Sequence, residues 1–429
     1  MKKKRSTALV WLVSLSLFGA VVTAIGLAPV QVQAVEQTII KLGCMGPLSG
    51  PAGPWGTIGR PGYDAFIELF NKEGFTVNGK KYGFEMVYVD DMNTPEGGAA
   101  AAKKLIYEDK VKFIVGHWSW NFATVAAVTN PAKVILITRT GSDIQPVSMG
   151  GSYDAKRMPY VVFGNPSAEQ FRNDAITLVK AFPGYKRLGF FDSEMGRGPG
   201  WDNFFKMLDK LGIRYHHEWY PYGTQDFAPY ITRFAEAGCD ILYGGGDITA
   251  AMLIDKQRWE MGHKDWHVGT AGGIIDPQMY YNVIGKEAAE GFIGQWFGPW
   301  EYKVTKVEPK WLNMAKEAMA IANERTMKET GKPFTYTNWI GWVPNHIGIL
   351  SEAMQKAGTV DDTDAIMKAI RGGTFSTVNG TFTMSGEKTF GSPVLFGTPG
   401  ALSEIRNGRE VYLFESPVQP RPNVWELLD

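Results

Sequence analysis

The chain has 429 residues, of which 44% are hydrophobic and 21% are charged, with 44 basic and 44 acidic side chains. This composition is that of an ordinary globular protein, and the length suffices for two domains that each bury a core. Four of the basic residues lie in the segment MKKKR at the N-terminus. Without it the chain keeps 40 basic and 44 acidic residues, a net charge of −4, which argues against nucleic acid as a partner.

Residues 1–34 have the three parts of a secretory signal peptide. A basic start is followed by an apolar stretch at 8–28 and by the small residues of VQA at 32–34. We therefore expect cleavage after Ala34 and a periplasmic mature protein. An uncleaved membrane anchor is the alternative, because the apolar stretch is long for a signal peptide.

The chain has two cysteines and six histidines, and their positions argue against a metal site. Cys44 and Cys239 lie in the strand-like runs IIKLGC and CDILYGGG. Export would permit a disulfide between them, but the two strands are typical of the cores of different domains, so we expect two buried free thiols. The histidines show no HExxH or similar spacing, so we expect neither a metal nor a cofactor.

Strand and helix signals alternate from residue 38 to residue 140. We expect strands at 38–44, 84–91, 112–118 and 134–140. Between them we expect helices at 60–74, 95–109 and 121–132. This alternation, with strands that are apolar almost throughout, is typical of a parallel sheet covered by helices on both faces.

The same alternation begins again at residue 160 and predicts a second parallel sheet. Its expected strands are 160–165, 187–194, 215–222, 239–246 and 266–272. Its expected helices are 167–182, 198–212, 226–238 and 249–262. A third section holds a strand-like run at 291–297 and helices at 309–331, 350–358 and 361–373. From about residue 375 we expect β-hairpins, with Asn-Gly turns at 379–380 and 407–408.

A loop rich in glycine and proline, GPLSGPAGPWGTIGRPGYDAF, links the first strand to the first helix. It lacks the GxGxxG spacing of dinucleotide-binding folds, and Pro47, Pro51 and Pro54 remove N–H groups that a phosphate would use. The sequence also lacks a P-loop and a GxSxG nucleophile motif. We therefore expect no catalytic residues and no enzyme activity.

This loop resembles the opening of the branched-chain amino-acid-type (leucine/isoleucine/valine-binding) periplasmic solute-binding proteins of ABC transporters. The resemblance continues in order through 87–116, 187–200, 226–246, 288–297 and 350–358. It implies the type I binding fold, with two doubly wound parallel-sheet α/β lobes joined by three hinge crossings. The lobes of such proteins close on a ligand in the cleft between them.

The resemblance also implies the lobe boundaries. We assign 35–163 plus 293–383 to lobe 1 and 164–292 plus 384–429 to lobe 2. The crossings are then expected near Gly164, Phe292 and Thr383.

Ligand-binding residues of the first lobe follow from the same resemblance. Trp55 matches the position from which an aromatic ring packs on the ligand, although it could instead cover the hinge. Ser119 matches a turn that holds a carboxylate, where its hydroxyl and the N–H groups of Trp120 and Asn121 would bind an anion at a helix start. Trp118 and Trp120 would favour a flat or apolar ligand, unless both indoles pack in the core of the lobe.

The segment TRTGSD matches the strand end where the family grips the head of an amino acid. Thr140 and Ser142 take those positions, and Arg139 departs from the family pattern. Its guanidinium could form a bidentate pair with a ligand carboxylate. The alternative is a surface salt bridge to Asp143 or Asp192.

The second lobe departs further from the family. Met195 takes the place of the usual aromatic residue, and Ala271 falls near the place of the acid that binds the ligand's amine. Asp247 is the nearest acid that could replace it. Because a buried ammonium needs a compensating anion, this departure makes an aromatic, amide or carboxylic-acid ligand as well supported as leucine. Trp342 and Asn345 could reach the cleft or pack in the core.

From these patterns we expect the extracytoplasmic substrate-binding protein of an ABC importer. It would capture a small solute (an amino acid, an amide or an aromatic or carboxylic acid) in the interlobe cleft. Its partners would be this ligand and an ABC permease in the cytoplasmic membrane, and the protein would be a monomer. The alternatives are a ligand-sensing module for a receptor partner and an exported hydrolase.

Overall fold

The computed structural model describes residues 37–50, 53–117, 121–138, 156–163, 167–194, 197, 199–245, 247–296, 307–334, 339, 341–387, 391–396 and 401–415. Within these ranges, none of the helices has the length and apolar character that crossing a membrane requires.

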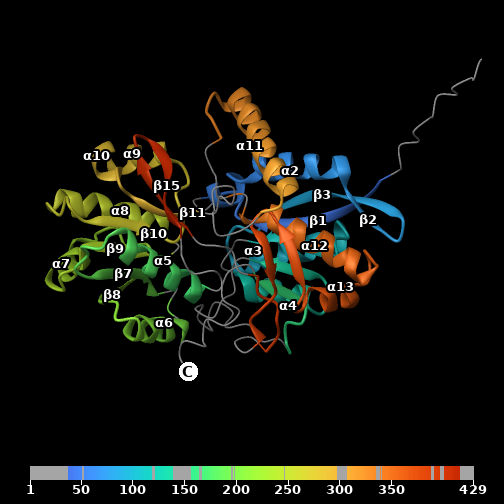
Figure 1. The fold of residues 1–429 in the computed structure, drawn as a ribbon, viewed down its shortest axis with the longest axis horizontal. Helices are drawn as coiled ribbons and strands as arrows, with labels where there is room; N and C mark the ends of the chain where they lie inside the picture. The colour runs from blue at the N-terminus through green and yellow to red at the C-terminus, as the bar shows by residue number, and fades with distance from the viewer. Residues whose placement is uncertain are drawn as a thin grey trace, which may run out of the picture. The chain divides into compact units, whose positions relative to one another are not determined.

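The first sheet contains six described strands. They are β1 (Thr38–Gly46), β2 (Phe75–Val77), β3 (Lys80–Asp90), β4 (Phe113–His117), β5 (Ile135–Thr138) and β6 (Val161–Phe163). Their order is β2-β3-β1-β4-β5-β6, as Figure 1 shows in part, and neighbours are parallel except for the hairpin β2–β3. This hairpin was not predicted from the sequence, although Asn78 and Gly79, both with positive φ, form a turn of the type that Asn-Gly favours.

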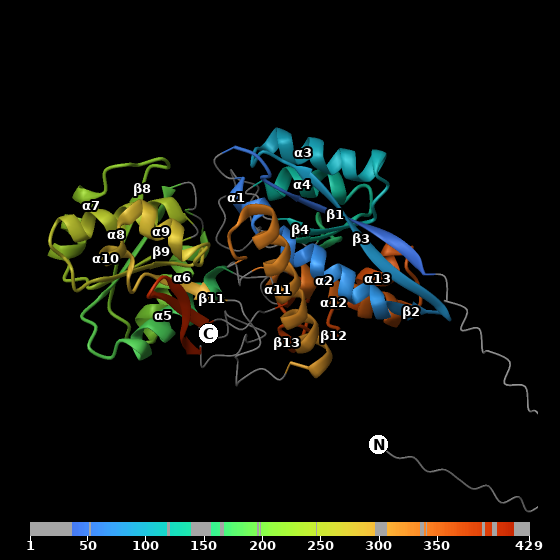
Figure 2. The ribbon, with the colours of Figure 1, turned by 90° about the horizontal axis from the view of Figure 1, so that it is seen from above.

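Helices cover both faces of the first sheet. They are α1 (Pro54–Thr57), α2 (Arg60–Glu73), α3 (Pro95–Lys103) with a π-helical turn (Lys104–Glu108), α4 (Phe122–Thr129), α11 (Pro309–Thr330), α12 (Val343–Ala357) and α13 (Thr363–Ile370). Figure 2 shows α3 and α4 over one face and α2, α12 and α13 over the other. Although α2 and α11 are far apart in sequence, they lie side by side, with Trp311 stacked 6.2 Å from Phe66 and 6.3 Å from Phe70. A hairpin of β12 (Thr374–Thr377) and β13 (Gly380–Thr383) packs on α12.

The second sheet contains seven described strands. They are β7 (Leu188–Ser193), β8 (Tyr215–Tyr220), β9 (Ile241–Gly244), β10 (His267–Thr270), β11 (Ile293–Trp296), β14 (Ala401–Arg406) and β15 (Arg409–Glu415). Their order is β15-β14-β11-β10-β9-β7-β8. The strands from β7 to β11 are parallel to one another, and β14 and β15 are antiparallel additions at one edge, joined by the expected Asn407-Gly408 turn.

Successive residues of the second sheet point into two separate cores, as the period of two in a strand requires. Phe191 and Leu242 belong to the core under α7 (Ala228–Glu236), α8 (Ile248–Glu260) and α9 (Pro277–Ile284). Phe190 and Tyr243 belong to the core under α5 (Ser167–Ala181) and α6 (Pro199–Lys210). The short helix α10 (Lys286–Ala289) follows α9. The second lobe is therefore a sheet with apolar side chains on both faces, which confirms the expected doubly wound architecture.

The expected lobe boundaries differ from the observed sheets in two places. The sequence assigned residue 293 onward to the first lobe, but β11 pairs with β10 and β14 in the second sheet. It assigned all residues after 383 to the second lobe, but the segment 394–396 belongs to the first core, where Leu395 bridges to Phe163. The chain has therefore not left the second sheet at Phe292, nor the first core at Thr383, and Gly164 lies outside the described residues. An apolar parallel strand has the same sequence pattern in either lobe, so periodicity does not assign it.

Both cysteines are free and buried, as expected. Cys44 lies in β1, and Cys239 lies just before β9, so the two sulfurs belong to the cores of different lobes. Burial raises the pKa of the Cys239 thiol to about 12 and raises that of Cys44 well above its ordinary value. Neither thiol is a reactive nucleophile in this environment.

Candidate ligand-binding site at the carboxyl ends of the strands

Open parallel α/β sheets bind ligands outside the carboxyl ends of their strands. In the first sheet these ends are Gly46, Asp90, His117, Thr138 and Phe163, and in the second sheet they include Ser193, Gly244 and Thr270. The residues that follow these ends include every ligand-binding residue expected from the sequence, from both lobes.

The glycine- and proline-rich loop after β1 is fastened to the end of β3 through Asp90. The Leu48 N–H donates to Asp90 Oδ1 over 2.9 Å, and the Ser49 hydroxyl donates to Oδ2. Burial alone would raise the pKa of Asp90, but these donors and the N–H of Met92 outweigh it and lower the pKa. The loop also turns back on itself closely, because a Cβ at Gly56 would lie 2.2 Å from the Pro47 carbonyl oxygen. Glycine at 56 is therefore required by space.

Trp55 lies in the short helix α1 inside this loop. It is half-buried and packs against the core cluster of the second lobe that α7, α8 and α9 cover. Ile58, three residues later, packs against that cluster and against the core of the first lobe. The first loop therefore contacts both lobes through its apolar side chains.

Asn121 begins α4 and is 4% exposed, and its side chain is bound at both ends. Its Nδ2 donates to the Thr94 carbonyl oxygen over 2.9 Å. Its Oδ1 lies 2.8 Å from His117 Nε2, and His117 Nδ1 lies 2.8 Å from Thr138 Oγ1. Both ends of the Asn121 carboxamide are thus hydrogen-bonded within the first lobe. The anion-binding role expected for this residue therefore rests on its backbone N–H.

Asp247 caps α8 in the second lobe. Its Oδ1 accepts a hydrogen bond from the Ala250 N–H over 3.0 Å, and its Oδ2 accepts one from the Tyr220 hydroxyl over 3.3 Å. Asp192, at the end of β7, accepts a hydrogen bond from the Ser193 N–H over 2.8 Å. Burial raises the pKa of Asp192 to about 7, the Ser193 N–H opposes this, and the negative charge of Asp247 adds to it. The ligand edge of the second sheet therefore carries two neighbouring acids.

Ala271 follows β10 and is 4% exposed. Its N–H donates to the Gly244 carbonyl oxygen over 3.0 Å, and its methyl group belongs to the core cluster that α5 and α6 cover. Next to it, the Thr270 hydroxyl donates to the Gly245 carbonyl oxygen and accepts from the Gly272 N–H over 3.1 Å. The polar groups of the turn after β10 are therefore hydrogen-bonded within the protein itself.

The other ligand-binding residues expected from the sequence lie outside the described residues: Trp118, Ser119, Trp120, Arg139, Thr140, Ser142 and Met195. Trp342 and Asn345 are buried at the start of α12. The neighbouring His346 accepts a hydrogen bond from the Gly116 N–H over 3.2 Å, which places the first turn of α12 beside the end of β4.

Several polar residues at the strand ends were not predicted as site residues from the sequence. His117, Thr138 and Asp90 are each the last residue of a parallel strand, and Asp192 is the last but one. That position is itself the signal that could have identified them, because carboxyl ends of parallel strands meet at one edge. Within the described part of the chain, no group of three or more His, Cys, Asp or Glu side chains could hold a metal ion.

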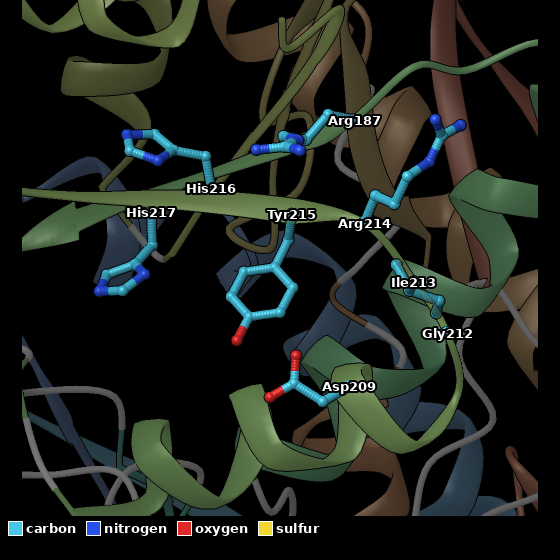
Figure 3. A pocket seen from close by; sticks show the side chains of 8 residues that line it. All are labelled: Arg187, Asp209, Gly212, Ile213, Arg214, Tyr215, His216 and His217. Atoms are coloured by element: carbon cyan, nitrogen blue, oxygen red, sulfur yellow. The ribbon is translucent and has the colours of Figure 1, made fainter. Parts of the chain in front are cut away.

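A cavity of about 520 Å³ lies at the opposite, amino-terminal end of β7 and β8 (Figure 3). It is lined by Arg187, Asp209, Gly212, Ile213, Arg214, Tyr215, His216 and His217. Figure 3 shows the two arginines and His216 on one side of β8 and Tyr215, facing Asp209, on the other. The charged groups do not converge on one point, and His216 Nε2 is already 2.7 Å from Glu218 Oε1. This cavity is therefore not the ligand-binding site of the sheets.

The order of the elements defines the class of protein. The described chain runs from the first sheet to the second, returns to the first core at α11 to α13, and ends in the second sheet at β14 and β15. It thus passes between the lobes three times, and both lobes present polar residues at the carboxyl ends of their strands. This is the architecture of a two-lobed ligand-binding protein.

Comparison with known proteins identifies the family. Residues 39–396 match the periplasmic binding protein family, and the chain belongs to it. The Leu/Ile/Val-binding protein homolog 3 of Brucella melitensis biotype 1 is 24% identical, over 82% of this chain and 89% of its own length. The expected resemblance to branched-chain amino-acid-type binding proteins is thereby confirmed, and the chain is a solute-binding protein of the extracytoplasmic kind.

Solved structures share the fold. A solute-binding protein of an ABC transporter from R. palustris, in complex with 4-hydroxybenzoate, superimposes with a TM-score of 0.68 at 19% identity and covers 91% of this chain and 99% of its own. A leucine-binding protein from Thermotoga maritima superimposes with a TM-score of 0.65 at 20% identity and covers 88% of this chain and 99% of its own. The type I binding fold expected from the sequence is confirmed.

Proposed function

We propose that this protein captures a small carboxylic or amino acid outside the cytoplasmic membrane and delivers it to an ABC permease. The observation that carries the proposal is the unequal polarity of the two ligand edges. Around His117 the first edge offers neutral hydrogen-bonding groups, with Arg139 following directly after β5, and the carboxylate of Asp90 at this edge is already bonded to Leu48 and Ser49. The second edge carries Asp192 and Asp247.

This polarity favours a ligand whose anionic end binds the first lobe. A carboxylate next to Asp247 and the ionised form of Asp192 would be repelled, whereas a cationic or neutral hydrogen-bond donor would be stabilised there. The contact of Trp55 with the second lobe's core supports an apolar or aromatic body between these two ends. The relatives named above are consistent with this range, since one structure holds 4-hydroxybenzoate and another protein is named for leucine.

We also propose that residues 1–34 direct export and are removed, that the mature protein is a periplasmic monomer, and that it carries out no chemistry on its ligand. A sensory role for a receptor partner uses the same fold and the same site. Co-purification with a permease, as opposed to a receptor, distinguishes the two roles.

Binding is tested on the mature chain from residue 35 by thermal shift and titration calorimetry. The panel contains 4-hydroxybenzoate, benzoate, leucine, isoleucine and leucinamide. A ligand at a hundred times its Kd stabilises the native state by about 2.7 kcal/mol, which is readily measured as a rise in Tm. A Trp55→Ala variant should bind about tenfold more weakly, and Tyr107→Ala, which removes an exposed ring in the first lobe, should bind normally. If no member of the panel raises Tm, the proposed ligand class is wrong.

A further inference from the structure

We propose that the side chains of His117, Asn121 and Thr138 form a positioning relay that sets ligand affinity without themselves touching the ligand. The inference rests on the proposed function, because it concerns the strand ends from which the ligand-binding segments of the first lobe begin.

The relay connects four segments of the first lobe. His117 ends β4, Thr138 ends β5, Asn121 begins α4, and Thr94 caps α3 by accepting a hydrogen bond from the Gly97 N–H over 3.0 Å. The three bonds between them measure 2.8, 2.8 and 2.9 Å. Neither His117 nor Thr138 has any exposed surface, so water does not compete for these bonds.

The packing of α3 leaves room for the relay. A Cβ at Gly98 would lie 2.5 Å from Asn121 Nδ2. The absence of a side chain at this position lets the helix approach the carboxamide closely. The glycine pair of the PEGGAAAA segment is therefore part of the same arrangement.

The direction of the hydrogen bonds follows from chemistry. A carbonyl oxygen only accepts, so the group of Asn121 that faces Thr94 is its NH₂, and the group that faces His117 is its oxygen. His117 Nε2 therefore carries a proton and donates it to Asn121 Oδ1. In a neutral imidazole the other nitrogen is an acceptor, so Nδ1 accepts from the Thr138 hydroxyl. The relay runs one way, from Thr138 through His117 and Asn121 to Thr94.

The relay acts on the ligand site through chain connectivity. Segment 118–120, which contains Ser119, begins at the residue after His117, and Arg139 directly follows Thr138. Thr94 follows closely on the end of β3. A single bonded chain thus fixes three strand ends relative to one another, and binding residues held by locked supports need less ordering when a ligand binds.

Protonation of His117 would reverse one bond. With a proton on Nδ1, the Thr138 hydroxyl must accept and turn its own proton away from His117. Burial lowers the pKa of His117, although its bond to Asn121 and the charge of Asp91 oppose this. Among the described residues, the other titratable groups close to this strand end are Cys44, whose thiol faces the Gly116 carbonyl oxygen, and His346 on α12. Burial keeps both neutral across the tested range, because it raises the pKa of Cys44 and lowers that of His346 to about 3.

The first test measures affinity by calorimetry for the panel ligand that binds the mature chain most tightly. Asn121→Ala should weaken binding about tenfold. Asn130→Ala is the matched control, since Asn130 is also a buried, doubly bonded asparagine but lies at the other end of α4. It should leave affinity unchanged at a similar loss of Tm. Equal effects of the two variants on affinity would overturn the relay.

The second test uses pH. As the pH falls from 7, wild-type affinity should stay constant through the range in which exposed histidines titrate and should decrease only below it, where His117 gains a proton, because only the neutral imidazole accepts from Thr138. His117→Gln keeps a donor for Asn121 and does not titrate, so its affinity should be flat over this range. The same pH dependence in the wild type and in His117→Gln would contradict the relay.

A third test needs no ligand and separates the relay from the proposed function. Long-range ¹H–¹⁵N NMR of the ligand-free mature chain should show His117 as the neutral Nε2–H tautomer, still neutral at a pH where exposed histidines are protonated. A His117 ring protonated on Nδ1, or one that titrates like a free imidazole, would overturn the relay even if a panel ligand binds. If no panel ligand binds, the proposed function fails while this spectrum still decides the relay.

Discussion

The two lobes bury different sets of titratable groups. The first lobe buries the imidazoles of His117 and His346 beside the single carboxyl group of Asp91, and the second buries the carboxyl groups of Asp174 and Asp255. Burial lowers the pKa of His346 to about 3, whereas it raises the pKa of Asp174 to about 8 against the opposing hydrogen bond from Tyr243. Both shifts favour the neutral form, as a low dielectric requires, but they change stability in opposite directions with pH.

The signs follow from linkage. The folded-state pKa of each histidine lies below its unfolded value, so the first lobe keeps their full contribution above about pH 6.5 and loses it as the pH falls. The folded-state pKa of Asp174 lies above its unfolded value. Its contribution is complete below about pH 4 and is lost as the pH rises through about 8. Acid therefore weakens the first lobe and alkali weakens the second. His217 and His267 of the second lobe also have lowered pKa values, mainly from burial, but both are only partly buried, so their effect is smaller.

The largest effect is expected where the second lobe buries a charged pair. Arg258 Nη2 lies 2.6 Å from Asp255 Oδ1, and Arg258 also donates to the carbonyl oxygens of His263 and Lys264. Arg258→Met leaves Asp255 buried without its counter-ion, which should cost about 3–5 kcal/mol. Hydrogen exchange followed in each lobe separately should show the loss in the second lobe, and more at pH 8 than at pH 5.

The double variant Arg258→Met with Asp255→Leu is the control for this experiment. It removes both charges and should recover most of the lost stability. If Arg258→Met is as stable as the wild type at both pH 5 and pH 8, the buried carboxyl group of Asp255 does not weaken the second lobe at high pH as the comparison of the lobes predicts.

The next effect isolates one carboxyl group. Asp174→Asn keeps an acceptor for the Tyr243 hydroxyl, which now donates to Asp174 Oδ2 over 2.8 Å, and removes the ionisation. We expect a gain on the order of 3 kcal/mol at pH 8 and almost none at pH 4. Urea unfolding at the two pH values measures this difference. A loss of stability at pH 8 would mean that Asp174 is ionised and stabilised in the folded state.

The sequence predicted the elements better than their assembly. The alternation of strands and helices gave both sheets, because the apolar periodicity is local. It did not assign β11 to a lobe, since a buried parallel strand has the same pattern in either sheet. The N-cap role of Asp247 could have been predicted from the sequence, because an aspartate just before the helical run ITAAMLI is an N-cap signal.

The relay could not have been predicted from the sequence. It joins residues 94, 117, 121 and 138, and their meeting depends on the pairing of β4 with β5 and on the contact between α3 and α4. No spacing in the sequence encodes these long-range contacts. Likewise, the resemblance gave position 271 an expected role in the cleft, but only the folded turn after β10 shows that its methyl group belongs to the core.

The last and smallest effect extends the comparison of the lobes to the ligand. Because the second edge carries Asp192 and Asp247, a ligand carboxylate needs its counter-charge from the first lobe, where Arg139 follows β5 in the sequence. Arg139→Ala should therefore weaken acids such as 4-hydroxybenzoate by about 1.5–3 kcal/mol and weaken neutral amides far less. Lys133→Ala is the control, since it removes an exposed cation just before the start of β5, where it pairs with Asp364. Calorimetry with an acid and its amide measures the difference. Equal losses of affinity for both ligands would make Arg139 a structural residue, and its proposed pairing with the ligand carboxylate would be wrong.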